Sequence, residues 1–399
     1  MTEYPEYFGE GAHTMSPSDR VRVLNLARNF DNPGWSIFPK LDHHKNQAIS
    51  PLSVSISLAM LLPGSAGKTL QELADILGLD RSVSDALPLL GKYIHEIACG
   101  KQSEQNRLHI ANGAFLNDTA GSVAPLYVDV IRKHLWAECV SVDFSRPVQT
   151  VETINNWVNR HTRSKIPVLI SKEDLANTAS LILVNALYMD TQWTFEFDLE
   201  QTKPEPFHLD DRGKEASVEV QMMRGEFACP VRRHNGGHFV AVALPMNGNL
   251  SFEVILPEKG YFEKVLDSIT PGYLADTTDV STNVNLGLPR FSMESTSQIG
   301  ELLQGAGLET AFDARADFSG ITGVRGDFGM ENIVHKVRVE VAEEGVKAAA
   351  VTANLFATGL TDRFTETECL TVDRPFFYRI SENLVKLSLF LGSVRNPQE

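Results

Sequence analysis

The sequence has only four cysteines in 399 residues, at positions 99, 139, 229 and 369. They form no Cys-x-x-Cys pair, so the spacing of a zinc ribbon or a redox motif is missing. We predict mostly free, buried thiols, and we expect Cys369, in a predicted exposed loop, to be the most reactive. His43-His44 and His95-Glu96 also lack the spacing of metal ligands, so we expect no metal site.

Basic residues are scarce as well. The chain holds 36 Lys and Arg against 51 Asp and Glu, which gives a net charge of −15. Nucleic-acid binding needs clustered cations, and we interpret the sharpest basic pair, Arg232-Arg233, as solvated surface. No apolar run is long enough for a transmembrane helix. We therefore expect no nucleic acid and no membrane among the partners.

Recognisable enzyme motifs are missing too. No Gly-x-Ser-x-Gly elbow occurs. The stretch from Gly64 to Thr69 is similar to a phosphate-binding loop, but Leu62 stands where that motif needs its first glycine. We predict the N-terminus of a helix there instead. We expect a protein that is not an enzyme and uses no cofactor, with an enzyme of unrecognised type as the alternative.

No Gly/Ser-rich or Pro-rich linker and no internal repeat divides the chain. With 43% hydrophobic and 22% charged residues, it can bury a large core. We predict one domain over residues 21–399, preceded by an extension over residues 1–20. Residues 1–11 are acidic and aromatic and lack a basic-then-apolar leader. The localisation is thus expected to be intracellular, or secreted with a signal peptide already removed.

The spacing of apolar residues predicts mixed helices and strands. Val21, Leu24, Ala27 and Phe30 share one helical face, with Ser18 as a predicted cap. Further helices are predicted over residues 50–62, 69–77 and 154–162, and strands over residues 180–188, 239–244, 250–256, 284–288 and 336–341. This mixture favours large sheets with helices packed around them.

The most informative part of the chain is the segment from Glu343 to Ala353, because two structures fit it. Its charged start and Gly345 are typical of an exposed loop, whereas the Ala/Val/Thr run that follows is typical of a strand. In a strand, Val346, Ala348, Ala350 and Thr352 share a face without charge or bulk, and Lys347, Ala349 and Val351 share the other. An alanine-rich helix is the alternative.

The sequence that follows favours the strand. No proline occurs over residues 345–374, so every residue there can donate to a sheet ladder. A connection this long inside a compact protein is typically a functional or a disordered loop. Residues 376–380 then predict a buried strand.

With these features, the chain resembles the serpins, proteinase inhibitors that trap their target by inserting a loop. The resemblance covers residues 21–397 and depends on motifs in family order, at residues 49–53, 183–188 with Trp193, 288–291, 318–321, 334–336, 373–377 and 389–397. It implies an α+β fold, with three β-sheets surrounded by about nine helices. It also implies an exposed reactive-centre loop at about residues 345–374.

The resemblance implies a metastable protein that works once. A serine proteinase cleaves the loop and forms an acyl-enzyme, and it is trapped covalently when the freed hinge enters the main sheet. The implied hinge consists of Glu343, Glu344, Gly345, Val346, Lys347, Ala348, Ala349 and Ala350. We predict inhibition, because the side chains on the inward face of the hinge are small. We expect the protein to be a monomer. The alternative is a non-inhibitory serpin that acts as a carrier or chaperone.

Other residues match positions that control insertion in the family. Ser50, Ser53, Asn185 and His335 match a polar cluster beneath the strands that part. Trp193 matches the tryptophan where the loop first enters, and Arg290 and Glu343 match a charge pair beside it.

The family's spacing from Gly345 places the reactive bond at Gly359–Leu360, with Thr358–Gly359 and Leu360–Thr361 as alternatives. Small and apolar residues there suit a subtilisin- or elastase-like serine proteinase. Arg363–Phe364 would suit a trypsin-like enzyme if the inserting segment is extended.

Overall fold

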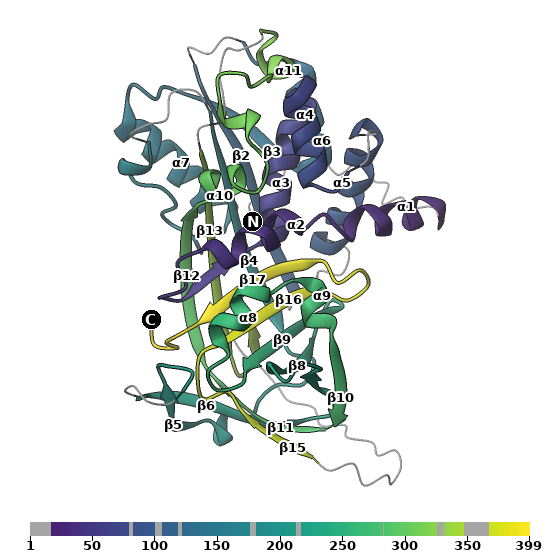
Figure 1. The fold of residues 1–399 in the computed structure, drawn as a ribbon. Helices are drawn as coiled ribbons and strands as arrows, with labels where there is room; N and C mark the ends of the chain where they lie inside the picture. Colours follow the sequence, from purple (N-terminus) through teal and green to yellow (C-terminus); the bar gives the residue numbers. More distant parts are fainter. Residues whose placement is uncertain are drawn as a thin grey trace.

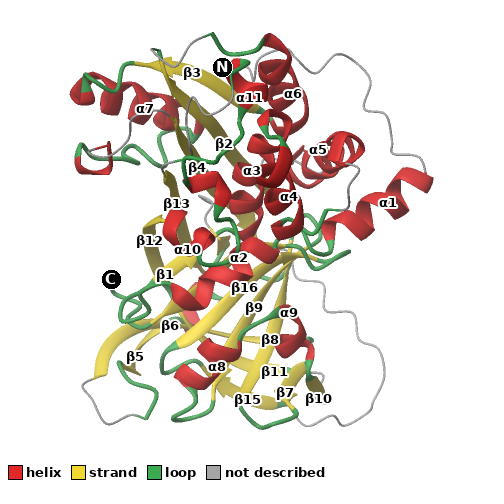
Figure 2. Cartoon of the chain, turned by 45° about the horizontal axis from the view of Figure 1, so that its top comes forward, coloured by secondary structure: helices red, strands yellow, loops and turns green. Residues whose placement is uncertain are grey.

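A computed structural model describes residues 17–79, 83–99, 106–118, 122–175, 181–212, 217–281, 283–324, 330, 332–346 and 367–399. These residues form three β-sheets, and most of the helices gather at one end of the molecule (Figures 1 and 2). The predicted α+β class is confirmed. Among the described residues, every helix is too short or too polar to cross a membrane.

The seven-stranded sheet is antiparallel between all of its neighbours. In spatial order it consists of β1 (Gln47–Ile49), β17 (Ser388–Val394), β16 (Phe376–Glu382), β9 (Leu250–Pro257), β8 (Phe239–Met246), β7 (Val231–His234) and β10 (Thr277–Ser281). Every residue of β16 and β17 is buried. The strands predicted over residues 239–244, 250–256 and 376–380 are confirmed.

The four-stranded sheet lies at the end of the molecule opposite the main group of helices (Figure 1). Its order is β15 (Glu368–Thr371), β11 (Val284–Pro289), β6 (Ser217–Phe227) and β5 (Lys203–His208). β15 pairs parallel to β11, so residues 368–371 form a strand within the stretch expected to be loop. Cys369 is exposed and free as predicted, but it lies on this strand because β11 offers it a ladder.

The six-stranded sheet contains the predicted hinge. Its order is β12 (Phe291–Gln298), β13 (Asn332–Ala342), β14 (Gly345–Val346), β4 (Leu181–Gln192), β2 (Asn106–Asn117) and β3 (Ala137–Val142). The strands predicted over residues 180–188 and 336–341 are confirmed as parts of β4 and β13.

Helix α3 (Pro51–Leu61) is the central helix, and all of its residues are buried. It begins where the Ser50 side chain accepts a hydrogen bond from the Ser53 N–H, an N-cap that satisfies one free donor of the first turn. Helix α1 (Pro17–Ala27) differs from the prediction: it starts before Ser18, so Ser18 is no cap, and Val21 is exposed. The other helices are α2 (Asn32–Ile37), α4 (Gly67–Ile76), α5 (Val83–Cys99), α6 (Pro125–Leu135), α7 (Pro147–His161), α8 (Phe262–Ser268), α9 (Pro271–Ala275), α10 (Gly300–Gln304) and α11 (Ser319–Thr322).

Two hydrophobic cores lie on opposite faces of the six-stranded sheet. The larger core joins α3 to side chains such as Leu183, Leu187 and Val337, and continues into the other sheets. The smaller core joins α7 and residues 166–175 to alternate side chains such as Val184 and Val334. Both faces of β4 and β13 are therefore covered, as the near-continuous apolar sequence of β4 predicts.

Candidate functional site

The candidate site is an opening between β13 and β4. Gly345 pairs with Ala342 and Gln192, and Val346 pairs with Val341 and Thr191. Farther along, residues 332–338 of β13 pair directly with residues 182–188 of β4. The two strands thus diverge toward the end that holds β14. The first two residues of the predicted inserting strand already occupy the gap.

The directions of these strands make further insertion possible. β13 and β4 are parallel to each other, and β14 is antiparallel to both of them. One strand can be antiparallel to two neighbours only if those neighbours are parallel. Parallel pairing is also slightly less stable per residue than antiparallel pairing. Separating β13 from β4 around a third strand exchanges one weaker ladder for two stronger ones.

Gly345 fits where no other residue does. Its φ of +152° is rarely adopted by L-residues, and a Cβ atom would lie 2.3 Å from the Thr191 carbonyl oxygen and 2.5 Å from the Gln192 Cα. Glycine avoids both the backbone strain and the clash. The next residue, Val346, is 1% exposed and faces the larger core, as strand alternation predicts.

Trp193 holds the turn before β14. Its indole N–H donates to the Ala342 carbonyl oxygen at 2.9 Å, and its backbone N–H donates to the Glu344 carbonyl oxygen at 3.1 Å. The ring is buried edge-on against Phe252 and Phe197, with centroids 5.4 and 6.0 Å away. Trp193 therefore fixes the point where the chain leaves β13 and turns into the opening.

Glu343 lies in the same turn and is buried. Its carboxylate accepts a hydrogen bond from the Thr202 hydroxyl at 2.8 Å and faces Arg290 Nη1 at 3.6 Å. The Arg290 side chain is 46% exposed, so solvent weakens this ion pair. The structure thus brings the predicted charge pair together, although the hydrogen bond from Thr202 is the closer contact.

The predicted polar cluster lies between α3 and the six-stranded sheet, and all four of its residues are buried. The Ser50 N–H donates to His335 Nε2 at 2.9 Å, and the Ser53 N–H donates to Ser50 Oγ at 3.1 Å. Asn185 is the register partner of His335 across the β13–β4 seam. Ser53 Oγ, Asn185 Oδ1 and His335 Nδ1 make no hydrogen bond with a described residue.

His335 is neutral in this environment. Because Nε2 accepts a hydrogen bond from Ser50, the ring proton belongs on Nδ1. Burial lowers the pKa of His335 to about 3, since a charged imidazole would lose its hydration there. The cluster therefore places a neutral donor, Nδ1–H, beside the seam.

Asn112 is a fifth member of the cluster that no motif in the sequence had identified. Asn112 lies opposite Asn185 on β2 and accepts a hydrogen bond from the Asn185 amide at 2.6 Å. Its own amide donates to the Leu135 carbonyl oxygen at 3.1 Å. The signal was available, because Asn112 interrupts the otherwise apolar or small run over residues 110–116, and a buried polar side chain needs a partner.

Helix α7 and the chain after it cover the other face of the seam. Ile154 and Val158 pack in the same core as Val184 and Val334. Lys336 of β13 donates from Nζ to the Val168 carbonyl oxygen at 2.6 Å, which fastens this cover to the strand.

A histidine also fastens α7 to the edge strand β3. His161 Nδ1 lies 2.8 Å from the Trp157 carbonyl oxygen, and Nε2 lies 3.1 Å from Glu138 Oε1. Burial alone would lower the pKa of His161, but these two acceptors outweigh it and raise the pKa above its ordinary value. The cover is thus attached at both β13 and β3, and separating β13 from β4 must disturb it.

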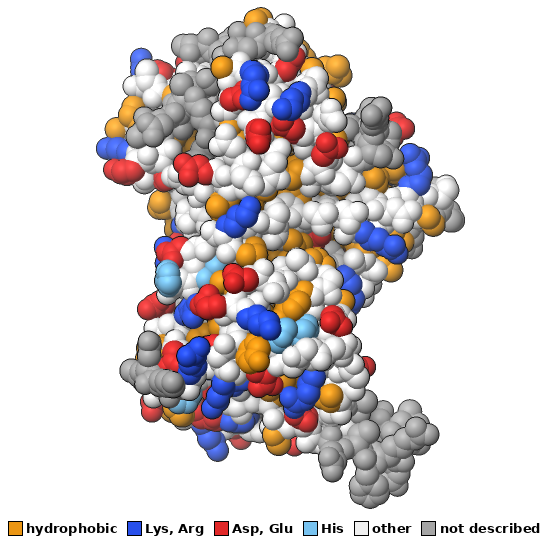
Figure 3. Space-filling model, in the orientation of Figure 1, with side chains coloured by type: hydrophobic (Ala, Val, Ile, Leu, Met, Phe, Trp, Pro, Cys, Tyr) orange, Lys and Arg blue, Asp and Glu red, His pale blue; other side chains and the backbone are white. Residues whose placement is uncertain are grey.

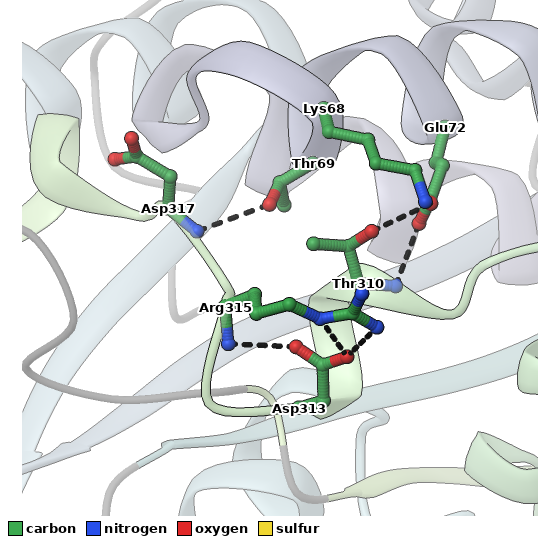
Figure 4. Close-up of polar contacts among 7 residues, drawn as sticks. All are labelled: Lys68, Thr69, Glu72, Thr310, Asp313, Arg315 and Asp317. Atoms are coloured by element: carbon green, nitrogen blue, oxygen red, sulfur yellow. Dashed lines mark hydrogen bonds and ion pairs between the residues drawn. The ribbon is translucent and has the colours of Figure 1, made fainter.

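The segment that is similar to a phosphate-binding loop has a structural role. As predicted, it contains the N-terminus of a helix, α4. Lys68 Nζ lies 3.3 Å from Glu72, Glu72 accepts hydrogen bonds from the N–H and the hydroxyl of Thr310, and Thr69 accepts one from the Asp317 N–H (Figure 4). These contacts tie α4 to residues 310–317.

Charges of both signs are mixed on the face shown in Figure 3. The predicted basic pair is engaged, because Arg232 pairs with Glu253, and Arg233 pairs with Glu258 and Glu368. Within the described part of the chain, no three His, Cys, Asp or Glu side chains are grouped as metal ligands.

The rest of the predicted loop stays a prediction. The hinge residues Lys347, Ala348, Ala349 and Ala350 lie outside the described residues. The candidates for the reactive bond, Thr358, Gly359, Leu360, Thr361, Arg363 and Phe364, lie outside them as well.

Comparisons with known proteins agree with these features. A family model described as Serpin (serine protease inhibitor) matches residues 34–397. The leukocyte elastase inhibitor of Sus scrofa is 31% identical over 399 residues, which cover 97% of this chain and 98% of that protein. Iris of Ixodes ricinus is 32% identical over 366 residues, which cover 88% and 92%. A highly specific serpin of the insect Tenebrio molitor superimposes with a TM-score of 0.83 at 26% identity, covering 96% of this chain and 99% of that one. The chain therefore belongs to the serpin family.

Proposed function

We propose that this serpin is inhibitory, and that it traps a serine proteinase covalently after the proteinase has cleaved residues of the segment between β14 and β15. The observation that carries the proposal is the partly filled opening. Two hinge residues lie in it, antiparallel to two strands that are parallel to each other. Cleavage would release the hinge, and the strand begun by β14 would then lengthen between β13 and β4.

If the register of β14 continues, each hinge residue that follows has a defined pair of neighbours on β13 and β4. Val346 pairs with Val341 and Thr191, so continuing the same register would put Ala348 between Val339 and Met189. Ala350 would come between Val337 and Leu187. These neighbours belong to the larger core, and a small inward side chain can pass beneath them without a clash. The small side chains of the hinge therefore support insertion.

The same register would bring Thr352 level with His335 and Asn185, on the face of the sheet that carries the polar cluster. His335 Nδ1 and Asn185 Oδ1 make no hydrogen bond with a described residue. A threonine hydroxyl can accept from one and donate to the other. The inserted strand would thus complete the hydrogen bonding of the cluster, which favours the inserted state over the native state.

The length of β13 limits how far the strand can extend. β13 has 11 residues, so hinge residues 345–355 would fill the gap. At about 3.4 Å per residue, a strand of that length spans about 37 Å. A proteinase bound through Gly359 would then be held by a tether of four residues beyond the end of the sheet. A proteinase bound through Arg363 would be held by a tether of eight residues. A short tether pulls the proteinase against the inhibitor, which supports Gly359–Leu360 as the reactive bond.

Small and apolar residues at the bond suggest an elastase- or subtilisin-like target. The relative from Sus scrofa is a leukocyte elastase inhibitor, which agrees with this choice.

The test is incubation with neutrophil elastase, pancreatic elastase, subtilisin and trypsin. We expect an SDS-stable band near the summed masses with at least one of them, and a released fragment that begins at Leu360. Cleavage of the loop by all of these enzymes without a stable band would contradict the proposal.

Heating the cleaved protein separates inhibition from the carrier or chaperone alternative. An inserted strand should make the cleaved form much more resistant to heat than the intact form, whereas a serpin that does not insert its loop should melt at the same temperature in both forms.

A further inference from the structure

The segment that joins β4 to β5 exposes two large hydrophobic side chains, Phe195 and Leu199. Their relative exposures are 63% and 67%. Of the exposed large hydrophobic residues in the described part of the chain, Phe195 is the only phenylalanine, and no other two are as close in sequence. Covering these two side chains with the surface of a partner would be favourable.

This exposure comes from a well-anchored segment. Trp193 and Phe197 on either side of Phe195 are buried, and Phe197 packs edge-on against Phe227 with centroids 4.8 Å apart. The Thr194 N–H donates to the Pro245 carbonyl oxygen at 3.0 Å, and the Phe197 N–H donates to the Glu343 carbonyl oxygen at 3.0 Å. Binding of a partner would therefore cost little conformational entropy, because the segment is already ordered.

The segment lies beside the turn that precedes β14. Trp193, Phe197 and Thr202 all donate hydrogen bonds to Glu343 or Glu344, in the turn from which the loop starts. The loop returns to the sheet at β15, and β5 and β15 are the two edges of the four-stranded sheet at this end (Figure 1). A proteinase that docks on the loop approaches the end of the molecule that carries Phe195.

The charges around these two side chains are mostly negative. Glu196, Asp198 and Glu200 are exposed, and Lys203 is the only cation over residues 193–203. Arg290, which reaches the same turn, is already paired with Glu343. The segment thus complements a surface with basic side chains around an apolar centre.

We propose that Phe195, Leu199, Glu196 and Glu200 form a secondary docking site for the target proteinase. They contact a basic and apolar patch on the rim of its active-site cleft, separately from the reactive loop. The inference rests on the proposed inhibitory function. The site accelerates the first encounter and takes no part in insertion, so it changes the association rate and leaves the stoichiometry of inhibition alone.

The experiment uses the full chain and whichever of neutrophil elastase, pancreatic elastase, subtilisin and trypsin forms the covalent complex fastest. The double variant Phe195→Ala/Leu199→Ala is expected to associate about tenfold more slowly with unchanged stoichiometry. Glu196→Gln/Glu200→Gln is expected to associate about threefold more slowly and to flatten the salt dependence of the rate. The matched control for the apolar pair is Leu126→Ala/Leu384→Ala, whose side chains are 76% and 53% exposed and lie away from this segment. The control for the acidic pair is Glu301→Gln.

A second measurement isolates docking from chemistry. The Kd of each variant for the same proteinase with its catalytic serine replaced by alanine is expected to weaken in step with the association rate. Rates and Kd values within twofold of the parent for both double variants would overturn the docking site while leaving the proposed function intact. A parent protein that forms no complex with any of the four proteinases would overturn the proposed function, and this inference with it.

Discussion

The central strands β16 and β17 of the seven-stranded sheet and the β13–β4 seam of the six-stranded sheet satisfy their buried polar groups in different ways. In the seven-stranded sheet, Arg379 donates to the Ser388 hydroxyl and the Lys386 carbonyl oxygen, and Glu382 accepts hydrogen bonds from Tyr93 and Asn249. In the six-stranded sheet, Asn185 and His335 each keep an atom without a described partner. The first sheet is antiparallel throughout, whereas the second has a parallel seam at β13–β4.

The difference bears on the proposed insertion, which requires one sheet that stays fixed and another whose strands can separate. Paired polar groups and antiparallel ladders make every separation of strands costly. At a parallel seam with partly satisfied polar groups, separating the two strands costs less free energy, provided that a third strand then pairs with both of them. Four changes to the chain test this contrast, from the largest expected effect to the smallest.

Val346→Arg is expected to convert the proposed inhibitor into a substrate. Val346 is buried on the face that an inserting strand turns toward the core, and an arginine there would have to lose its hydration. We expect the stoichiometry of inhibition to rise at least about tenfold, because the desolvation of a charge costs several kcal/mol. The yield of SDS-stable complex measures this effect.

The matched control is Val254→Arg on β9 of the seven-stranded sheet, which is equally buried. We expect that variant not to fold, since its strand has no exposed alternative position. A Val346→Arg variant that still traps proteinase would show that the hinge does not insert.

Gly345→Ala is expected to expel β14 from the opening. The added Cβ would collide with the Thr191 carbonyl oxygen at a backbone conformation that only glycine adopts readily. We expect a loss of about 2 kcal/mol or more in the free energy of unfolding, together with faster amide hydrogen exchange at Val346.

Gly237→Ala in the turn between β7 and β8 is the control for backbone strain alone, because its φ is +70° and its Cβ would meet nothing within 4 Å. We expect its free energy of unfolding to fall by only about 1 kcal/mol. Equal losses in the two variants would mean that the clash with β4 is not important.

His335 should make the native state sensitive to acid. Burial lowers its pKa to about 3 in the folded protein, whereas an unfolded histidine titrates near about 6.5. The unfolded state therefore binds the extra proton between these values, and the stability contributed by neutral His335 is lost as pH falls from about 6.5 toward about 3. The loss is up to about 1.4 kcal/mol per pH unit.

The measurement compares the free energy of unfolding at pH 7.5 and 5.5 for the parent and for His335→Gln. The free energy of unfolding should change less between these two pH values in the variant than in the parent. The same pH dependence in both proteins would remove His335 as its source.

Glu343→Gln is expected to have the smallest effect. The amide keeps an acceptor for the Thr202 hydroxyl and loses only the attraction to Arg290, which is half-exposed. We expect a loss of about 0.5 kcal/mol in unfolding free energy. Asp42→Asn, which removes an exposed pair with Lys45, is the control and should change nothing measurable. A loss above about 2 kcal/mol would mean that the ion pair holds the turn.

The strands of the sheets could be predicted from the sequence more accurately than the position of β14 in the opening between β13 and β4. Apolar runs such as residues 250–256 predict strands because burial alone explains them. The position of β14 depends on contacts with Thr191 and Gln192, which are distant in sequence, so no local pattern could show that two hinge residues are already inserted. β15 escaped prediction for the same reason, since its ladder comes from β11.

The polar cluster was predicted only in part. Family motifs identified Ser50, Ser53, Asn185 and His335, and the structure places them side by side. Asn112 belongs to no such motif, and its role follows only from its position opposite Asn185. Similarly, Ser18 has the chemistry of a helix cap, but helix α1 starts at Pro17, a residue favoured in a first turn.

In the proposed insertion, the position of Gly345 and Val346 between β13 and β4 imposes a fixed order on the residues that follow. β13 and β4 are separated only at this end, so the following residues would enter one after another, and each would separate the next pair of residues along the seam. A side chain that cannot pass will stop the process at its own position. The number of residues incorporated in a stalled molecule would therefore identify the obstacle, and a proteinase held at that point would be displaced by only part of the full distance.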